Sequence, residues 1–260
     1  MGEPSVIDYQ KQGRVALLTM NNPPANTWTV DSLNRLAALV DELNGDGDIR
    51  SLVLTGEGEK FFCAGAELSL FADGDKGKAH AMAQAFGRAF EALSEFRGLS
   101  VAAINGYAMG GGLEAALACD LRIAAERAVM GLPEARVGLL PCAGGTQLLP
   151  HLVGEAWAKR LILCGERLKA EQALHIGLVE EVMPKSELLA RAMALADSAG
   201  RQSPGSVAVC KTLIQSARQR PLNEGRVRER DAFMALFDTE DQREGVNAFL
   251  EKREPTWRNR

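Results

Sequence analysis

Two glutamates are the residues of this sequence best suited to chemistry. Glu114 follows the run Gly110-Gly111-Gly112 and begins an otherwise apolar stretch, whereas Glu134 follows Pro133 in a segment bounded by apolar residues. Carboxylates in such settings can act as general acids and bases. Each also fits a plainer structural role, an acid near a helix N-terminus, where the helix dipole favours negative charge. Taken separately, Glu114 leaves the two interpretations even, whereas Glu134 favours the structural one.

The glycine run predicts the entrance of a helix. Inside a helix each glycine would cost about 1 kcal/mol relative to alanine. In the first turn, however, unpaired N–H groups and the positive end of the dipole would stabilise a developing oxyanion. Ala64-Gly65-Ala66 likewise lets a ligand approach backbone N–H groups closely. On its own, that segment is more typical of a tight turn that ends a strand.

A nucleotide-binding loop is an alternative for the glycine run. Gly110, Gly112 and Ala115 match the dinucleotide fingerprint GxGxxA after a predicted strand. That fingerprint normally lies in the first βαβ unit, with an acidic residue at the end of the next strand. Here it lies in mid-chain, and the next strand-like stretch begins with its acid, Asp120. The alternative therefore receives little support.

Hydrophobic periodicity predicts the elements that position these residues. Short apolar runs predict strands, and stretches with apolar residues every three or four positions predict helices between them. This alternation indicates parallel βαβ units. After about residue 185 helical patterns dominate, which predicts a core over residues 1–195 and a helical C-terminal region over residues 196–260. The predicted strands cover residues 14–20, 51–55 and 101–104, and the predicted helices 31–44, 186–199, 206–218, 224–237 and 241–252.

Composition excludes several classes of protein. The chain has 260 residues, 46% of them hydrophobic, which is enough for one large domain with a core of its own. A net charge of -4 gives no reason to expect a nucleic-acid partner, and no apolar run is long enough to cross a bilayer. The cysteines form no CxxC pair and most have apolar neighbours, which predicts buried, reduced thiols and no metal site. Residues 1–10 show neither a secretory signal nor a transit pattern, so we expect a cytoplasmic protein. They are Cys63, Cys119, Cys142, Cys164 and Cys210.

Four stretches, taken in order, closely resemble the crotonase (enoyl-CoA hydratase/isomerase) superfamily. The likeness runs from about residue 20 to the C-terminus. It implies an α/β fold, a spiral of ββα units, with an α-helical C-terminal region that drives homotrimers, usually paired into hexamers. The matching stretches are FFCAGAEL, INGYAMGGGLEAALACDLRIA, GLPEARVGLLPCAGGTQLLP and TEDQREGVNAFLEKREPTW.

The resemblance also implies a substrate and an anion site. Members of the superfamily bind acyl-CoA thioesters and stabilise an enolate-like intermediate with two backbone N–H groups, here those of Ala66 and Gly111. The coenzyme A moiety is expected near Ala25, Ala64 and Ala66, and no cofactor is expected beyond the coenzyme A of the substrate. The chain departs from the common pattern at Glu67, where an aspartate is usual.

The paired glutamates distinguish between branches of the superfamily. Its hydratases carry both, whereas isomerases commonly retain one. Adding water to a 2-enoyl thioester requires a water activated at C3 and a proton delivered to C2, which two carboxylates can divide. The resemblance thus implies a hydratase in which Glu114 activates the water and Glu134 protonates C2. The alternatives are a 3-enoyl-CoA/2-enoyl-CoA double-bond isomerase or another crotonase-type acyl-CoA enzyme and, from another class, a non-catalytic acyl-CoA-binding scaffold.

Overall fold

A twisted, mostly parallel sheet forms the body of the protein in the computed structural model, which describes residues 6–259. Within that range the sheet has six strands, all parallel to their neighbours except the first pair, which is antiparallel. In spatial order the strands are β1 (Ile7–Gln12), β2 (Val15–Met20), β3 (Ser51–Gly56), β5 (Leu99–Ile104), β7 (Leu121–Ala125) and β10 (Glu181–Met183).

A second, smaller sheet consists of short strands that follow those of the first. The chain repeats one pattern: a strand in the large sheet, a three-residue strand in the small sheet, and then a helix. These units are β3–β4–α2, β5–β6–α3 and β7–β8–α4. This order is the predicted spiral of ββα units. The new elements are β4 (Phe61–Cys63), β6 (Tyr107–Met109), β8 (Val129–Gly131), β9 (Leu168–Lys169), α2 (Lys76–Glu95), α3 (Gly111–Ala118) and α4 (Gly145–Leu163).

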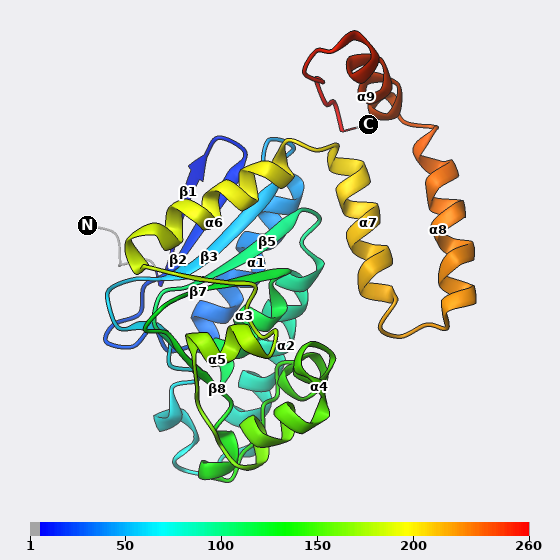
Figure 1. Cartoon of the computed structure of the whole chain (residues 1–260). Helices are drawn as coiled ribbons and strands as arrows, with labels where there is room; N and C mark the ends of the chain where they lie inside the picture. The colour runs from blue at the N-terminus through cyan, green and yellow to red at the C-terminus, as the bar shows by residue number, and fades with distance from the viewer. Residues whose placement is uncertain (1–5, 260) are drawn as a thin grey trace.

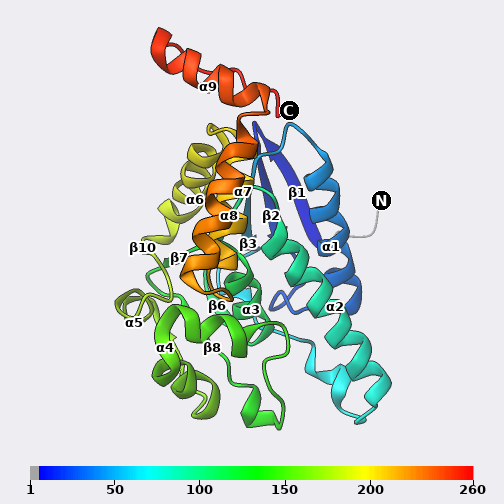
Figure 2. The ribbon, with the colours of Figure 1, turned by 90° about the vertical axis from the view of Figure 1, so that its right-hand side faces the viewer.

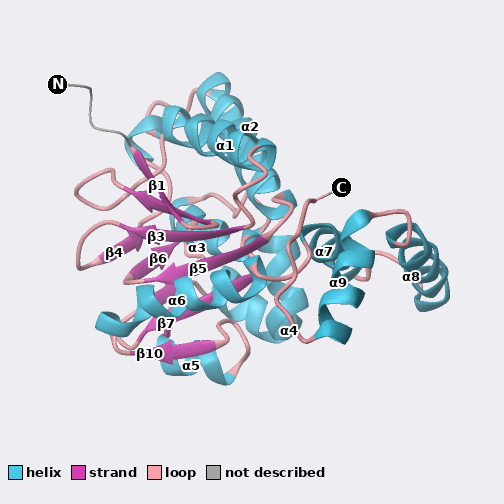
Figure 3. Ribbon diagram, turned by 90° about the horizontal axis from the view of Figure 1, so that it is seen from above, coloured by secondary structure: helices cyan, strands magenta, loops and turns pink. Residues whose placement is uncertain are grey.

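Helices cover both faces of the large sheet, as Figures 2 and 3 show. On β3, Leu52 and Leu54 pack in the core formed with α1 (Val30–Gly45) and α2, whereas Val53 packs in the core formed with α6 (Lys185–Gly200). Because successive residues of a strand point to opposite faces, a strand covered on both sides must be apolar throughout. That requirement explains the unbroken apolar runs of the central strands.

The last three helices extend away from the sheets (Figure 1). They are α7 (Pro204–Ser216), α8 (Leu222–Leu236) and α9 (Glu240–Glu251). Lys211 anchors α7, because its Nζ donates to the Phe96 carbonyl (2.7 Å), the Gly98 carbonyl (3.1 Å) and Asp120 Oδ2 (2.8 Å). The predicted division at residue 195 falls inside α6 and stays a prediction. The short elements not yet named are α5 (Ala170–His175) and the 3-10 turns η1 (Leu68–Phe71) and η2 (Glu134–Val137).

Cysteine burial follows the prediction only in part. Cys63 and Cys119 are buried in the core, but Cys142, Cys164 and Cys210 are exposed. The prediction was wrong for Cys164 because α4 ends there at the surface and its apolar neighbour Leu163 is itself 69% exposed. Among the residues described, no helix is both long and apolar enough to span a membrane.

Candidate active site

A cavity of about 650 Å³ lies at the carboxyl ends of the short strands β4, β6 and β8. The segments that leave these strands, around Ala66, Gly111 and Glu134, all line it. Carboxyl ends of parallel strands meet at one edge of a sheet, which is where α/β proteins commonly bind ligands. The ββα repeat therefore brings together three segments that are far apart in the sequence.

The N–H group of Ala66 is directed away from its strand partner. Trp28 N–H donates to the Gly65 carbonyl (2.8 Å), and Glu67 N–H donates to the Trp28 carbonyl (3.1 Å). In a parallel pair, one residue bonds through its N–H and C=O to the two neighbours of its partner. The partner's own N–H and C=O then point away from that residue. That partner is Ala66, a lining residue of the cavity. Within residues 6–259, neither Ala66 N–H nor Gly111 N–H donates to a protein acceptor.

The N–H of Gly111 points out of the N-terminus of α3. Glu114 N–H donates to the Gly110 carbonyl (3.0 Å), so that carbonyl is directed into the helix and the N–H of the same peptide unit, on Gly111, faces outward. Gly110 has φ 54° and ψ -129°, a conformation that a residue with a side chain would adopt only with strain. The positive end of the helix dipole adds to the attraction for an anion at this N–H.

The two N–H donors belong to segments in close contact. A Cβ atom added to Gly65 would lie 2.9 Å from the Met109 carbonyl oxygen and 3.5 Å from Gly111 N. At Gly112 an added Cβ would lie only 2.2 Å from the Cys63 carbonyl oxygen, so α3 packs directly on the backbone of β4. Glycine at positions 65 and 112 lets the two segments approach each other closely. This contact explains why glycines occur there, which the sequence alone did not decide.

Glu114 is buried with one carboxylate oxygen held and the other free. Glu114 is only 2% exposed, and its Oε1 accepts hydrogen bonds from the N–H groups of Ala143 and Gly145, both at 2.8 Å. Burial raises the pKa of Glu114, and these two N–H donors oppose that rise by stabilising the ionised form. Oε2 has no hydrogen-bond partner in the described part of the chain. An oriented carboxylate with one free oxygen is suited to accept a proton.

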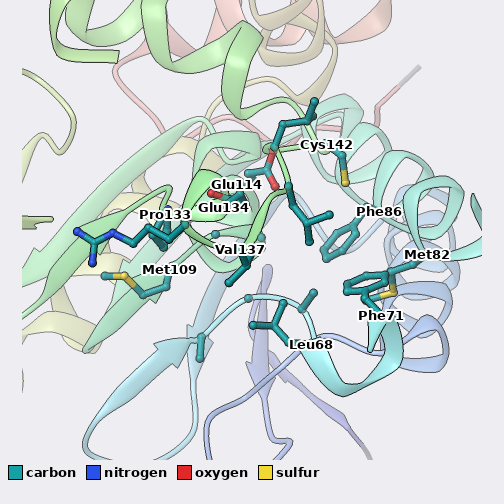
Figure 4. Close-up of a pocket in the computed structure, with 18 of the residues that line it drawn as sticks. Leu68, Phe71, Met82, Phe86, Met109, Glu114, Pro133, Glu134, Val137 and Cys142 are labelled. Atoms are coloured by element: carbon teal, nitrogen blue, oxygen red, sulfur yellow. The ribbon is translucent and has the colours of Figure 1, made fainter. Parts of the chain in front are cut away.

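Glu134 lies beside Glu114 in a different environment (Figure 4). Its Oε2 is buried and has no hydrogen-bond partner among the residues described. Burial, with a smaller contribution from the negative charge of Glu114, raises the pKa of Glu134 to about 7. This rise favours the protonated form of Glu134 at a pH where an exposed glutamate would be ionised. Two carboxyl groups whose environments differ in this way can serve as a base and an acid within one pocket.

The opposite side of the cavity is apolar. Side chains from η1 and α2 face the glutamates across it, as Figure 4 shows, and an apolar chain could lie against them. We call these residues the apolar wall: Leu68, Phe71, Met82 and Phe86. Further apolar residues border the mouth, where Val137 is 55% and Leu140 65% exposed.

Five of the six residues predicted to form the site line this one cavity: Ala64, Ala66, Gly111, Glu114 and Glu134. The sixth, Ala25, is not among the lining residues, but its carbonyl accepts a hydrogen bond from Ala64 N–H (3.0 Å). The roles of all six stay predictions.

Sequence reasoning missed the groups that support these residues. The N–H groups of Ala143 and Gly145 hold Glu114, and Trp28 bonds both donor segments. The pair Gly144-Gly145 at the start of α4 is the one sequence signal that could have indicated the first of these. In the described chain, no group of three or more His, Cys, Asp or Glu residues is arranged to hold a metal ion.

Comparison with known proteins gives consistent relatives across the whole chain. Residues 10–260 match the model of the family described as enoyl-CoA hydratase/isomerase. A short-chain-enoyl-CoA hydratase of Clostridium acetobutylicum is 37% identical over 94% of this chain and 94% of its own. A structure of DspI from Pseudomonas aeruginosa is 60% identical with a TM-score of 0.95, covering 99% of this chain and 98% of that one. An enoyl-CoA hydratase of Bacillus anthracis is 36% identical with a TM-score of 0.94, covering 98% and 100%.

Proposed function

We propose that this chain, which belongs to the enoyl-CoA hydratase/isomerase family, adds water across the 2,3 double bond of a 2-enoyl-CoA thioester to give a 3-hydroxyacyl-CoA. The observation that carries the proposal is the pair of glutamates in one cavity with two unpartnered backbone N–H groups. An isomerase needs one proton shuttle. Hydration uses two groups beside the same double bond, and Glu114 and Glu134 supply them.

In the proposed mechanism the thioester oxygen accepts hydrogen bonds from Ala66 N–H and Gly111 N–H. Glu114 takes a proton from a water molecule as the water oxygen bonds to C3, and negative charge moves through C2 to the thioester oxygen. Glu134 then delivers a proton to C2, so that H and OH have been added across the double bond. The coenzyme A moiety passes Ala25 and Ala64, and the reaction needs no cofactor beyond it.

The assay that tests this function offers two substrates. With crotonyl-CoA we expect loss of the conjugated enoyl-thioester absorbance and formation of 3-hydroxybutyryl-CoA. With a 3-enoyl-CoA we expect little conversion to the conjugated isomer. Reaction of the 3-enoyl-CoA alone would identify an isomerase instead. Binding of both thioesters without turnover of either would identify a non-catalytic acyl-CoA-binding protein.

We also propose that the chain forms a homotrimer or a homohexamer through its last helices. These helices expose several large apolar side chains. Monomeric proteins rarely expose large apolar patches, and burial against further copies would remove these side chains from water. Light scattering should therefore give a mass three or six times 28.0 kDa. A 28.0 kDa particle at micromolar concentration would contradict the proposal. The exposed apolar side chains on α7, α8 and α9 are Ile214, Leu222, Val227, Phe233, Met234, Val246, Phe249 and Leu250.

A further inference from the structure

Trp28 is a fully buried residue that lies just before α1, outside the cavity. It is 1% exposed, and its ring packs edge-on against Phe90 with 5.6 Å between the ring centroids. It is not among the residues that line the cavity, so it does not reach a substrate. Its hydrogen bonds nevertheless go to the two segments that carry the N–H donors.

The backbone of Trp28 holds the first donor. Its N–H and C=O bond to the residues on either side of Ala66, at 2.8 Å and 3.1 Å. These two bonds fix the direction in which the Ala66 N–H points, because they determine which side of the backbone faces Trp28. A shift of Trp28 would therefore turn or displace the Ala66 N–H.

The side chain of Trp28 holds the second donor. Its Nε1–H donates to the Gly111 carbonyl oxygen at 3.2 Å. A Cβ added to Gly111 would lie 2.8 Å from the Phe86 ring and 3.5 Å from Trp28 Cδ1, so Gly111 sits against both rings. A buried indole N–H needs an acceptor, and here the acceptor belongs to the residue whose own N–H faces the cavity.

We infer that Trp28 is a positioning residue, which fixes the spacing and direction of the Ala66 and Gly111 N–H groups by bonding to both segments. The inference rests on the proposed function, since these donors matter only if a thioester oxygen binds between them. Removing one oxyanion donor lowers kcat by about 10²–10³-fold in other enzymes. Loosening a donor that remains present should cost less, and we expect about a tenfold loss.

The experiment removes the indole N–H and keeps the ring. Trp28 is replaced site-specifically by 3-benzothienylalanine, in which sulfur takes the place of the N–H group. We expect kcat for crotonyl-CoA to fall about tenfold with KM within about twofold, because the donors act mainly in the transition state. The wild type should lower the carbonyl stretching frequency of a bound enoyl thioester, and the Trp28 variant should lower it less.

Trp257 provides a matched control. Its Nε1–H also donates to a backbone carbonyl, that of Arg201 at 2.7 Å, but at the C-terminal end of the chain. The same analogue at Trp257 should leave kcat and the carbonyl frequency unchanged. Trp28→Phe serves as a second variant that lacks the N–H, and thermal unfolding checks that each protein is folded.

The outcomes separate this inference from the proposed function. A wild type that neither hydrates an enoyl thioester nor lowers its carbonyl frequency would overturn the proposed function. A wild type that does both, with folded Trp28 variants that match it in kcat and in carbonyl frequency, would overturn the inference and leave the function intact. A fall in kcat with an unchanged carbonyl frequency would also overturn it, because the effect would then not pass through the donors.

Discussion

Replacing Glu114 by Gln should lower kcat for crotonyl-CoA hydration by about 10³-fold, within the range that general acid–base groups contribute. Gln keeps an oxygen that can accept from the N–H groups of Ala143 and Gly145, which now lie 2.8 Å from Glu114 Oε1. Its amide nitrogen would occupy the place of the free oxygen and cannot remove a proton from water. We expect KM and the unfolding temperature to stay close to the wild type. Steady-state kinetics and thermal unfolding measure these quantities.

Glu134 provides the comparison with Glu114, because the proposed mechanism requires Glu134 in its protonated form and Glu114 in its ionised form. With a pKa of about 7, Glu134 should lose its proton as pH rises, so kcat/KM should fall about tenfold per pH unit above that value. Glu134→Gln should lower activity and remove this descending limb. If the wild-type rate instead rises through pH 7, Glu134 acts as the base. Glu114→Gln activity above a tenth of the wild type would contradict the role of Glu114.

Replacing Gly112 by Ala should lower the free energy of unfolding by about 3 kcal/mol, the upper part of the usual cost of overpacking. The new Cβ would lie 2.2 Å from the Cys63 carbonyl oxygen and 2.9 Å from Cys63 Cβ. Neither is the flexible end of a side chain, so α3 must move away from β4 and take Gly111 with it. Hydration activity should therefore fall together with stability. Urea unfolding gives the free energy, and the crotonyl-CoA assay gives the activity.

The matched control is Gly87→Ala, a second glycine within a helix. Gly87 lies within α2, and its added Cβ would meet only Glu91 Oε1, at an ordinary 3.6 Å. Because alanine favours the helix, we expect this variant to gain up to about 1 kcal/mol in free energy of unfolding. Equal unfolding curves for Gly112→Ala and the wild type would contradict the direct packing of α3 on β4.

The long elements could be predicted from the sequence because their periodicity is set by burial. The helix predicted over residues 31–44 is observed as α1 (Val30–Gly45), whose inward side is apolar. The strands β4, β6 and β8 were missed, because three residues are too few to show a period of two. The edge strand β1 was missed because its residues after Ile7 and Asp8 are exposed and polar.

The candidate site divides in the same way. Glycines and glutamates whose types suit chemistry could be named from the sequence, and those named lie around one cavity except for Ala25. Their supports depend on contacts between distant segments. Ala143 reaches Glu114 across 29 positions, and Trp28 reaches Gly111 across 83. No local pattern marks such a contact, since only the folded chain creates it.

The ββα repeat separates the predicted catalytic residues from the apolar residues that would contact a substrate. Each of three successive units places predicted catalytic residues in the cavity: Ala66 after β4, Gly111 with Glu114 after β6, and Glu134 after β8. Strand register and backbone hydrogen bonds set these positions. Phe71 and Met82, in contrast, belong to the apolar wall and contribute no reactive group. If the proposed function holds, substitutions in the apolar wall can therefore change which acyl chain fits while the backbone positions of the predicted catalytic residues stay the same.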